Sequence, residues 1–213
     1  HNNDRPGILL SSAVEKYANF YGVACGEKNV LFTNNDSAYE TAISLYQKGI
    51  KIEAIIDNRE EIDSKLIKQI EKNNIKVYKG YTVVDTSGYK RINKISIMQL
   101  SKDGQRVVGS KISINCDCLG ISGGWTPAVH LFTQSGGKLK FRDEDQVFIP
   151  NIYPSDQISI GSCNGDFTLN EILSNVPKNL KEFLNIKKTD YENLEVNSSF
   201  NKSKRNIWLL PSD

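Results

Sequence analysis

The chain has 213 residues, of which 38% are hydrophobic and 24% are charged, a composition that suits one large or two small globular domains. Its 27 Lys and Arg residues against 25 Asp and Glu residues give a formal net charge of +2, so we expect no basic face that binds nucleic acid. No apolar run approaches the roughly 20 residues that a membrane-spanning helix needs, so we expect no contact with a membrane.

The beginning of the chain is polar and has none of the features of a signal peptide. Its first residue is His1 and not Met, and we therefore expect a processed or excised piece of a longer protein. Without a targeting signal, the expected location is the cytoplasm.

The first regular pattern is a β-α-β unit. The apolar residues 30–32 are typical of a short buried strand, and the polar loop 33–37 follows them. Apolar residues at helical spacing then continue as far as Gly49, which predicts a helix that ends there. Residues 50–56 predict a second strand, which Asp57 ends. A unit of about 30 residues predicts two parallel strands with a right-handed crossover.

The next pattern adds a second helix and then changes to a run of strands. Apolar residues at helical spacing predict a helix over 62–70, and a third short strand follows over 75–78. Further strands are expected at 81–84, 92–100 and 106–114, with a hairpin turn at 102–104. A β-meander that follows a β-α-β-α-β unit is a common build for a pyridine-nucleotide subdomain.

The second half of the chain has a different character. A strand over 112–121 is expected to run directly into the segment 122–127, which contains two glycines. Pro177 should kink or split the last helix, because proline removes a backbone hydrogen bond. We interpret the polar segment 185–206 as a linker or as a segment wrapped on a missing partner. The remaining predicted elements are a helical turn at 128–133, short strands at 139–141, 147–149, 158–160 and 207–211, and a helix at 167–183.

These patterns predict an α/β fold with a split architecture. Residues 28–111 should form an NAD-type, Rossmann-like β-α-β-α-β subdomain with a β-meander. The flanks 1–27 and 112–183 should fold together as part of a flavin-type, disulfide-reductase-like domain into which this subdomain is inserted. Residues 184–213 are then a linker and a terminal strand.

The loop between the first strand and the first helix stands where a dinucleotide-binding fold carries its glycine-rich turn. At that place backbone N–H groups and the helix N-terminus point at a pyrophosphate. Glycines are absent here, but Asn tolerates positive φ better than most other residues. The Asp36 carboxylate would repel a phosphate that it faced, unless it caps the helix instead. The candidate cofactor-binding residues are Thr33, Asn34, Asn35, Asp36 and Ser37, and the alternative is a site that has lost or weakened its ligand.

Asp57 ends the second strand, roughly 20 residues beyond this loop. That is the place of the acid that binds the ribose 2′-OH in NAD sites, and a carboxylate there favours NAD over NADP. The alternative is an ordinary turn residue at the end of a strand. On the first interpretation, replacing Asp57 should weaken NAD binding, because the ribose hydroxyls lose a charged acceptor.

Two glycine-containing segments in the second half predict contacts with a flavin. The first follows an apolar strand, and its two glycines would let the chain turn tightly beside a cofactor. The second lies between a strand and a helix, where the helix N-terminus would face the phosphate and ribityl arm. We predict no catalytic residue and no metal site. The candidate residues of the two segments are Gly123, Gly124, Trp125, Gly161, Asn164 and Gly165.

The four cysteines predict no metal site, because the two histidines of the chain add too few ligands. Cys116 and Cys118 are two apart in a strand-like run and therefore share a face. We interpret Cys25, Cys116, Cys118 and Cys163 as small buried residues in a reducing compartment, with a redox pair as the alternative.

Five stretches of the sequence resemble the alpha subunit of heterotetrameric sarcosine oxidase. The most distinctive are the Thr-Asn-Asn-Asp-Ser loop at 33–37 and the Gly-Gly-Trp-Thr-Pro-Ala-Val-His run at 123–130. The full set covers residues 3–7, 21–23, 32–37, 122–131 and 135–139. The resemblance implies NAD as a cofactor, with FAD as a second cofactor when the missing part of the domain is present.

The resemblance also implies an oxidoreductase that demethylates sarcosine to glycine and passes the one-carbon unit to tetrahydrofolate. It implies partner subunits of the beta, gamma and delta type, with the covalent flavin in the beta subunit. The chain matches only the middle of an alpha subunit, without the first flavin-binding motif, the folate-binding region or a Cys-x-x-Cys. We therefore expect a cofactor-binding portion with no turnover of its own. The alternatives are a structural scaffold with a vestigial nucleotide site, or an alpha-type subunit of a related amine, opine or proline dehydrogenase.

Overall fold

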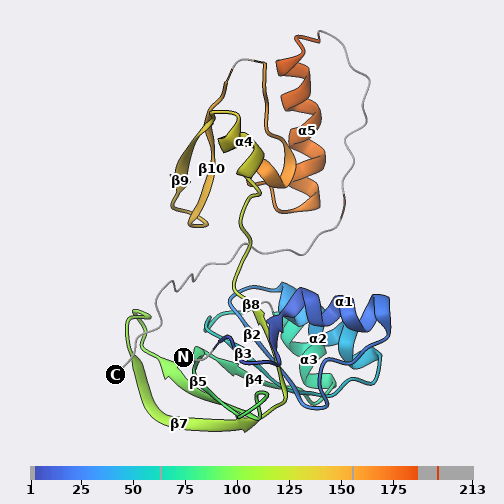
Figure 1. The fold of residues 1–213 in the computed structure, drawn as a ribbon, viewed down its shortest axis with the longest axis vertical. Helices are drawn as coiled ribbons and strands as arrows, with labels where there is room; N and C mark the ends of the chain where they lie inside the picture. Colours follow the sequence, from blue (N-terminus) through green and yellow to red (C-terminus); the bar gives the residue numbers. More distant parts are fainter. Residues whose placement is uncertain (1–2, 63, 155, 187–195, 197–213) are drawn as a thin grey trace. The chain divides into compact units, whose positions relative to one another are not determined.

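The computed structural model describes residues 3–62, 64–154, 156–186 and 196. They form two compact units, of which the first runs to Gly124 and the second begins at Trp125. The first unit contains the helices α1 to α3 and the strands β1 to β8, and the second contains α4, α5, β9 and β10 (Figure 1).

The first unit is built on a five-stranded parallel sheet with the strand order β1-β8-β2-β3-β4. Helices α2 and α3 connect β2 to β3 and β3 to β4, so the predicted β-α-β-α-β unit is confirmed. The strands are β1 (Ile8–Leu10), β8 (Cys118–Ser122), β2 (Asn29–Thr33), β3 (Ile52–Asp57) and β4 (Lys76–Lys79). The helices are α1 (Ser11–Tyr21), α2 (Ser37–Gln47) and α3 (Ser64–Lys72).

Apolar layers cover both faces of this sheet. Because strand residues alternate between faces, Leu31 and Ile55 pack against the helices, whereas Val30 and Ile56 pack against the meander. A parallel sheet that is buried on both faces needs apolar residues at most positions of its strands, which explains the composition of β2 and β3. The predicted meander is confirmed as β5 (Tyr81–Ser87), β6 (Lys94–Leu100) and β7 (Val107–Asn115).

The expected strand over 112–121 is in fact two strands in different sheets. β7 ends in the meander, and β8 begins beside β2 after two intervening residues. Between them the Asp117 carboxylate accepts hydrogen bonds from the backbone N–H groups of Glu27 and Lys28, which holds this turn against the start of β2. Because β8 also pairs with β1, residues of both flanks lie in the central sheet, and the first compact unit runs to Gly124.

The second unit consists of a β-hairpin with helices on either side of it in the chain. The expected strand at 158–160 is not formed, since these residues pair with no other described strand. Its elements are α4 (His130–Gln134), β9 (Lys138–Arg142), β10 (Val147–Ile152), the 3-10 helix η1 (Gly161–Asn164) and α5 (Leu169–Phe183).

Helix α5 differs from its prediction at both the proline and the start. It continues through Pro177 as one helix, and it begins after a capping box in which Thr168 and Glu171 each bind the other's backbone N–H. The expected linker 185–206 lies almost entirely outside the described residues, and the expected strand 207–211 lies entirely outside them.

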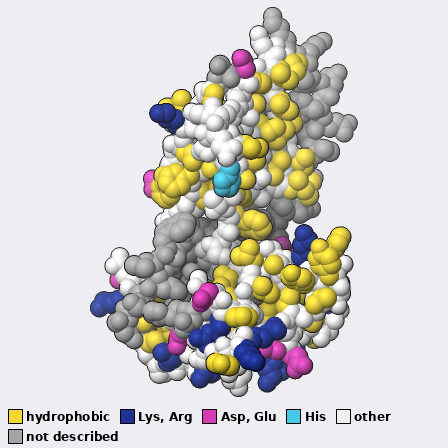
Figure 2. All heavy atoms as spheres, in the orientation of Figure 1, with side chains coloured by type: hydrophobic (Ala, Val, Ile, Leu, Met, Phe, Trp, Pro, Cys, Tyr) yellow, Lys and Arg dark blue, Asp and Glu magenta, His cyan; other side chains and the backbone are white. Residues whose placement is uncertain are grey.

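Hydrophobic side chains lie at the surface of both units. On the face shown in Figure 2, the first unit also carries Lys and Arg side chains beside Asp and Glu side chains. No residue of α5 is buried. Within the described ranges, every helix is too short or too polar to cross a bilayer.

Candidate functional site

Three strands of the central sheet end side by side in polar loops. Thr33, the last residue of β2, lies opposite Asp57 of β3 on one side and opposite Ser122 of β8 on the other. In open parallel sheets, ligands bind outside the carboxyl ends of the strands, where connections leave the sheet in opposite directions. The structure therefore brings together, at one edge, eight of the predicted site residues, which are Thr33 to Ser37, Asp57, Gly123 and Gly124.

The loop 33–37 is held by its own side chains. The hydroxyl of Thr33 donates to the carbonyl of Asn35 at 2.9 Å and accepts from its N–H at 3.0 Å. The side-chain oxygen of Asn35 accepts from the N–H of Ser37 at 3.0 Å and from its hydroxyl at 2.6 Å. Asn35 thus caps α2, whereas Asp36 occupies the N-cap position and makes no side-chain cap bond. Neither Asn of the loop adopts positive φ. The turn that glycines make in other dinucleotide folds is therefore held here by side-chain hydrogen bonds and not by residues in the left-handed conformation.

The same loop is tied to the end of β8. The amide of Asn35 donates to the carbonyl and the hydroxyl of Ser122 at 3.1 and 3.0 Å, and the amide of Asn34 donates to the carbonyl of Gly123 at 3.0 Å. A Cβ on Gly123 would meet no atom within 4 Å, and the nearest atoms to one on Gly124 are those of the Asn34 side chain, at 4.0 Å. The two glycines therefore leave open space beside the loop.

A buried network joins the loop to the end of β3. Asp57 has 0% exposure, and its Oδ1 accepts hydrogen bonds from the backbone N–H and the Nε of Arg59 at 2.9 and 3.1 Å. Its Oδ2 accepts from Arg59 Nη2 at 2.8 Å and from the Tyr39 hydroxyl at 2.9 Å. Arg59 Nη1 lies 2.8 Å from Oδ1 of Asp36. One guanidinium therefore bridges two carboxylates that the sequence analysis treated separately.

The charge of this network is negative, because two carboxylates share one guanidinium. Burial alone would lower the pKa of Arg59. The hydrogen bond and the negative charge of Asp57, together with those of Asp36, raise this pKa above its usual value, so the guanidinium stays charged. Burial, and then the neighbouring charge of Asp57, raise the pKa of Tyr39, so its hydroxyl stays a donor. Sequence analysis missed the roles of Arg59 and Tyr39, and the available signal was the Asp-x-Arg spacing at the end of a strand.

We expect Tyr39→Phe to reduce the alkaline destabilisation of the first unit. A free tyrosine ionises near pH 10, and the raised pKa keeps Tyr39 protonated in the folded chain above that pH. The unfolded chain then releases a proton that the folded chain keeps, so the free energy of unfolding falls as the pH rises. Between about pH 9 and about pH 11, urea unfolding should show the wild type losing about 1.4 kcal/mol more than the variant. Tyr89→Phe, at a 93% exposed site, is the control, and equal losses in wild type and Tyr39→Phe would contradict the assignment.

The residues at this edge of the sheet suit a dinucleotide at the loop 33–37 but not at Asp57. The loop 33–37, the helix N-terminus behind it and the open space at Gly123 suit a phosphate-bearing ligand. Asp57 does not suit a ribose in the arrangement described, because each of its oxygens already accepts at least two hydrogen bonds. Asp36 places a further negative charge next to the loop.

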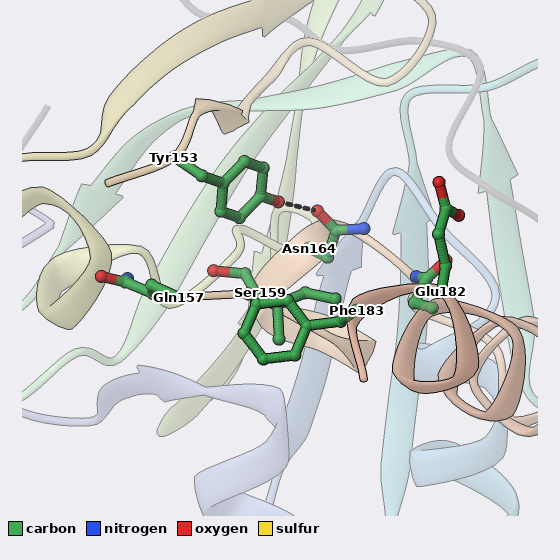
Figure 3. Close-up of a pocket in the computed structure, with 8 residues that line it drawn as sticks. Tyr153, Gln157, Ser159, Asn164, Glu182 and Phe183 are labelled. Carbon is green, nitrogen blue, oxygen red and sulfur yellow. Dashed lines mark hydrogen bonds between the residues drawn. The ribbon is translucent and has the colours of Figure 1, made fainter. Parts of the chain in front are cut away.

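The other four predicted site residues, Trp125, Gly161, Asn164 and Gly165, lie in the second unit. A Cβ on Gly165 would come within 2.8 Å of Nη2 of Arg142 and 2.9 Å of Ile149, so close packing already requires glycine there. Asn164 Oδ1 accepts a hydrogen bond from the Tyr153 hydroxyl at 3.1 Å, at the rim of a cavity of about 370 Å³ (Figure 3).

The cysteines are all unpaired thiols. Burial raises the pKa of Cys116 and of Cys118 to about 12, which suits the interpretation of small buried residues and disfavours reactive thiolates. Cys163 is exposed, contrary to expectation, because it lies in the short helix η1 at the surface of the second unit. Within the described residues, no group of three or more His, Cys, Asp or Glu residues is placed to hold a metal ion.

Comparison with known proteins adds relatives that are similar in sequence. No family model matches the chain. The sarcosine oxidase alpha subunit of Corynebacterium sp. (strain P-1) is 34% identical over 175 residues, which are 81% of this chain and 18% of that protein. The sarcosine oxidase alpha subunit of Rhizobium meliloti (strain 1021) is 31% identical over 147 residues, which are 69% of this chain and 14% of that protein.

The chain is similar in sequence to the alpha subunit of sarcosine oxidase. The resemblance predicted from the motifs is therefore confirmed. The chain spans less than a fifth of the length of these relatives. Among solved structures, the HOCl-induced flavoprotein disulfide reductase RclA from Escherichia coli has a TM-score of 0.59 at 12% identity, covering 87% of this chain and 41% of that one. This likeness confirms the expected disulfide-reductase-like α/β fold.

Proposed function

We propose that this chain is the cofactor-binding portion of a sarcosine-oxidase-type alpha subunit, and that its first unit binds NAD. The observation that supports this proposal is the meeting of three polar loops, after β2, β3 and β8, at one edge of the parallel sheet. On this proposal the pyrophosphate faces the loop 33–37, and Gly123 and Gly124 leave room for it.

The proposed reaction of the whole enzyme is the oxidative demethylation of sarcosine to glycine, with transfer of the one-carbon unit to tetrahydrofolate. The sequence similarity to alpha subunits supports this reaction and partner subunits of the beta, gamma and delta type. We found no candidate catalytic residue among the described residues, so we expect no consumption of oxygen when sarcosine is added to this chain alone.

The second unit is proposed to be part of a flavin-type domain that binds FAD only together with the rest of that domain. A helix with one apolar stripe normally buries that stripe. Helix α5 has 15 residues and none of them is buried, while Phe141 and Phe148 of the hairpin are 46% and 54% exposed. These apolar surfaces suit a unit that packs against further protein.

One observation favours a second candidate function, a structural scaffold with a vestigial nucleotide site. Arg59 and Tyr39 fill the acceptor positions of Asp57, and Asp36 adds negative charge beside the loop that should face a pyrophosphate. In a structural scaffold, this network would serve only to stabilise the fold. A measurement of NAD binding distinguishes the two candidate functions.

We expect titration calorimetry to show NAD binding to the wild-type chain and weaker binding to Gly123→Val. A valine would fill the open space beside the Asn34 side chain, at a backbone position that does not require positive φ. The expected loss is about tenfold in affinity, equivalent to about 1.4 kcal/mol. Gly123→Ala is the control, because one methyl group intrudes less. A well-folded wild-type chain that shows no NAD binding would favour the scaffold.

A further inference from the structure

Helix α1 lies at one end of the helix layer that covers the parallel sheet of the first unit. It packs against α2, and α2 packs against α3 (Figure 1). Glu15 of α1 accepts a hydrogen bond from the hydroxyl of Thr41 at 2.8 Å, which marks the side of α1 that faces α2. Under α1, strand β1 is the edge of the sheet among the described residues, so the layer ends at this helix.

The side of α1 that points away from α2 carries three exposed aromatic residues. Tyr17 follows Glu15 by two residues, so at about 100° per residue it lies nearly opposite to it on the helix. Phe20 and Tyr21 follow one turn later on the same side. These three residues, the aromatic stripe, are 45%, 76% and 59% exposed, and the ring centroid of Tyr21 lies 5.8 Å from that of Tyr17 and 5.0 Å from that of Phe20.

An end helix normally turns charged residues outward, as α3 does at the other end of the layer with three lysines in nine residues. The aromatic stripe of α1 departs from this rule. Exposed apolar patches mark interaction sites, and aromatic residues are enriched at the centres of protein interfaces. The outer side of α1 is therefore a candidate protein–protein contact.

The residues of this side of α1 suit a second copy of the same helix. In a two-fold dimer one surface patch meets itself, so the patch has to be self-complementary. If two α1 helices run antiparallel about an axis at Tyr17, Ala13 of one copy lies opposite Tyr21 of the other, since each is four residues from the axis. A small residue that faces a large one lets two helices interdigitate. The helix carries one Glu and one Lys, so two copies bring no net charge to the contact.

We propose that two copies of this chain associate through the aromatic stripes of their α1 helices, which run antiparallel about a two-fold axis at Tyr17. With about 200 Å² for a whole aromatic side chain, the three exposed rings present roughly 350 Å² per copy. Leu10 and Val23, exposed at the two ends of the helix, add further apolar area. The sum for two copies approaches the roughly 1,000 Å² of a small specific interface, so we expect a weak dimer with a micromolar dissociation constant.

Analytical ultracentrifugation of the chain without nucleotide measures this association. The mass of the wild type should rise with concentration from the 23.9 kDa of one copy to about twice that value. Phe20→Glu should raise the dissociation constant about 30-fold or more, because it places a charge in an apolar interface. Its fold should be unchanged by circular dichroism, since Phe20 is exposed. Phe148→Glu, at an aromatic residue of the second unit that is 54% exposed, is the matched control and should leave the constant unchanged.

A cross-link tests the position of the axis and keeps the proposal testable if Phe20→Glu fails to fold. The exposed Cys163 is first replaced by serine, so that it forms no disulfide of its own. Under oxidation, Tyr17→Cys in this background should form a disulfide between two copies, because residues at a two-fold axis meet their own equivalents. Lys16→Cys, at the neighbouring exposed position, should not. Equal cross-linking of the two variants would overturn the proposed contact.

Two results of the ultracentrifugation would also overturn the dimer. A wild-type chain that stays monomeric at every concentration would leave the aromatic stripe to a different protein segment. A dimer that dissociates in Phe148→Glu and persists in Phe20→Glu would place the contact in the second unit. Neither result bears on NAD binding, which is measured separately, so the proposed function and the dimer fail independently.

Discussion

Replacing Arg59 with methionine is expected to lower the free energy of unfolding of the first unit by about 3–5 kcal/mol. Arg59 is 7% exposed and is the cation that faces Asp36 and Asp57, which are 2% and 0% exposed. Methionine fills a similar volume but leaves both carboxylates buried without their counter-ion. The cost is therefore that of uncompensated buried charge, and it is a large part of the roughly 5–15 kcal/mol that stabilise a typical domain.

Urea unfolding near neutral pH measures this loss. Arg106→Met removes an exposed arginine from the same unit and should change the free energy of unfolding by less than about 0.5 kcal/mol. The double variant Asp36→Asn with Arg59→Met should recover part of the loss, because only one buried carboxylate then lacks its partner. A loss below about 1 kcal/mol in Arg59→Met would show that the network is open to water.

The Asp57→Asn variant is expected to bind NAD about 10- to 150-fold more weakly than the wild-type chain. A carboxylate that accepts from two ribose hydroxyls contributes on the order of 1.5–3 kcal/mol, because one partner of each hydrogen bond is charged. Asparagine keeps the shape of the side chain but offers one acceptor oxygen in place of two. On the proposed NAD site, the ribose therefore loses a charged acceptor.

Titration calorimetry with NAD gives the comparison, and thermal unfolding checks that each variant is folded. Glu40→Gln is the matched control, since it removes one negative charge at an exposed position of the first turn of α2 without touching Asp57. Its affinity should equal or slightly exceed that of the wild type. If Asp57→Asn and Glu40→Gln behave alike, Asp57 contributes only its charge and does not hold the ribose.

Much of the first unit was predictable from local sequence, because its signals lie within short windows. The apolar runs of β2 and β3, the helical spacing of α2 and the stop at Gly49 each reflect a period of 2 or 3.6 residues. The same windows placed the loop 33–37 and Asp57 at strand ends. Strand β1 and the helix α1 that follows it were not predicted. The strand has three residues and is partly exposed, so it gives little periodic signal that would mark the start of this part of the fold.

The sequence by itself thus determined the order of most elements, the fold class and the family resemblance, since these depend on periodicity and on motifs of a few residues. Tertiary structure alone decided that β8 lies beside β2, which brings Gly123 against Asn34 across 89 residues of chain. It also decided that Arg59 bridges Asp36 and Asp57, because the register between β2 and β3 sets the distance between their loops. Spacing along the chain does not reveal such contacts, since a strand finds its neighbours through hydrogen bonds to segments far away in sequence.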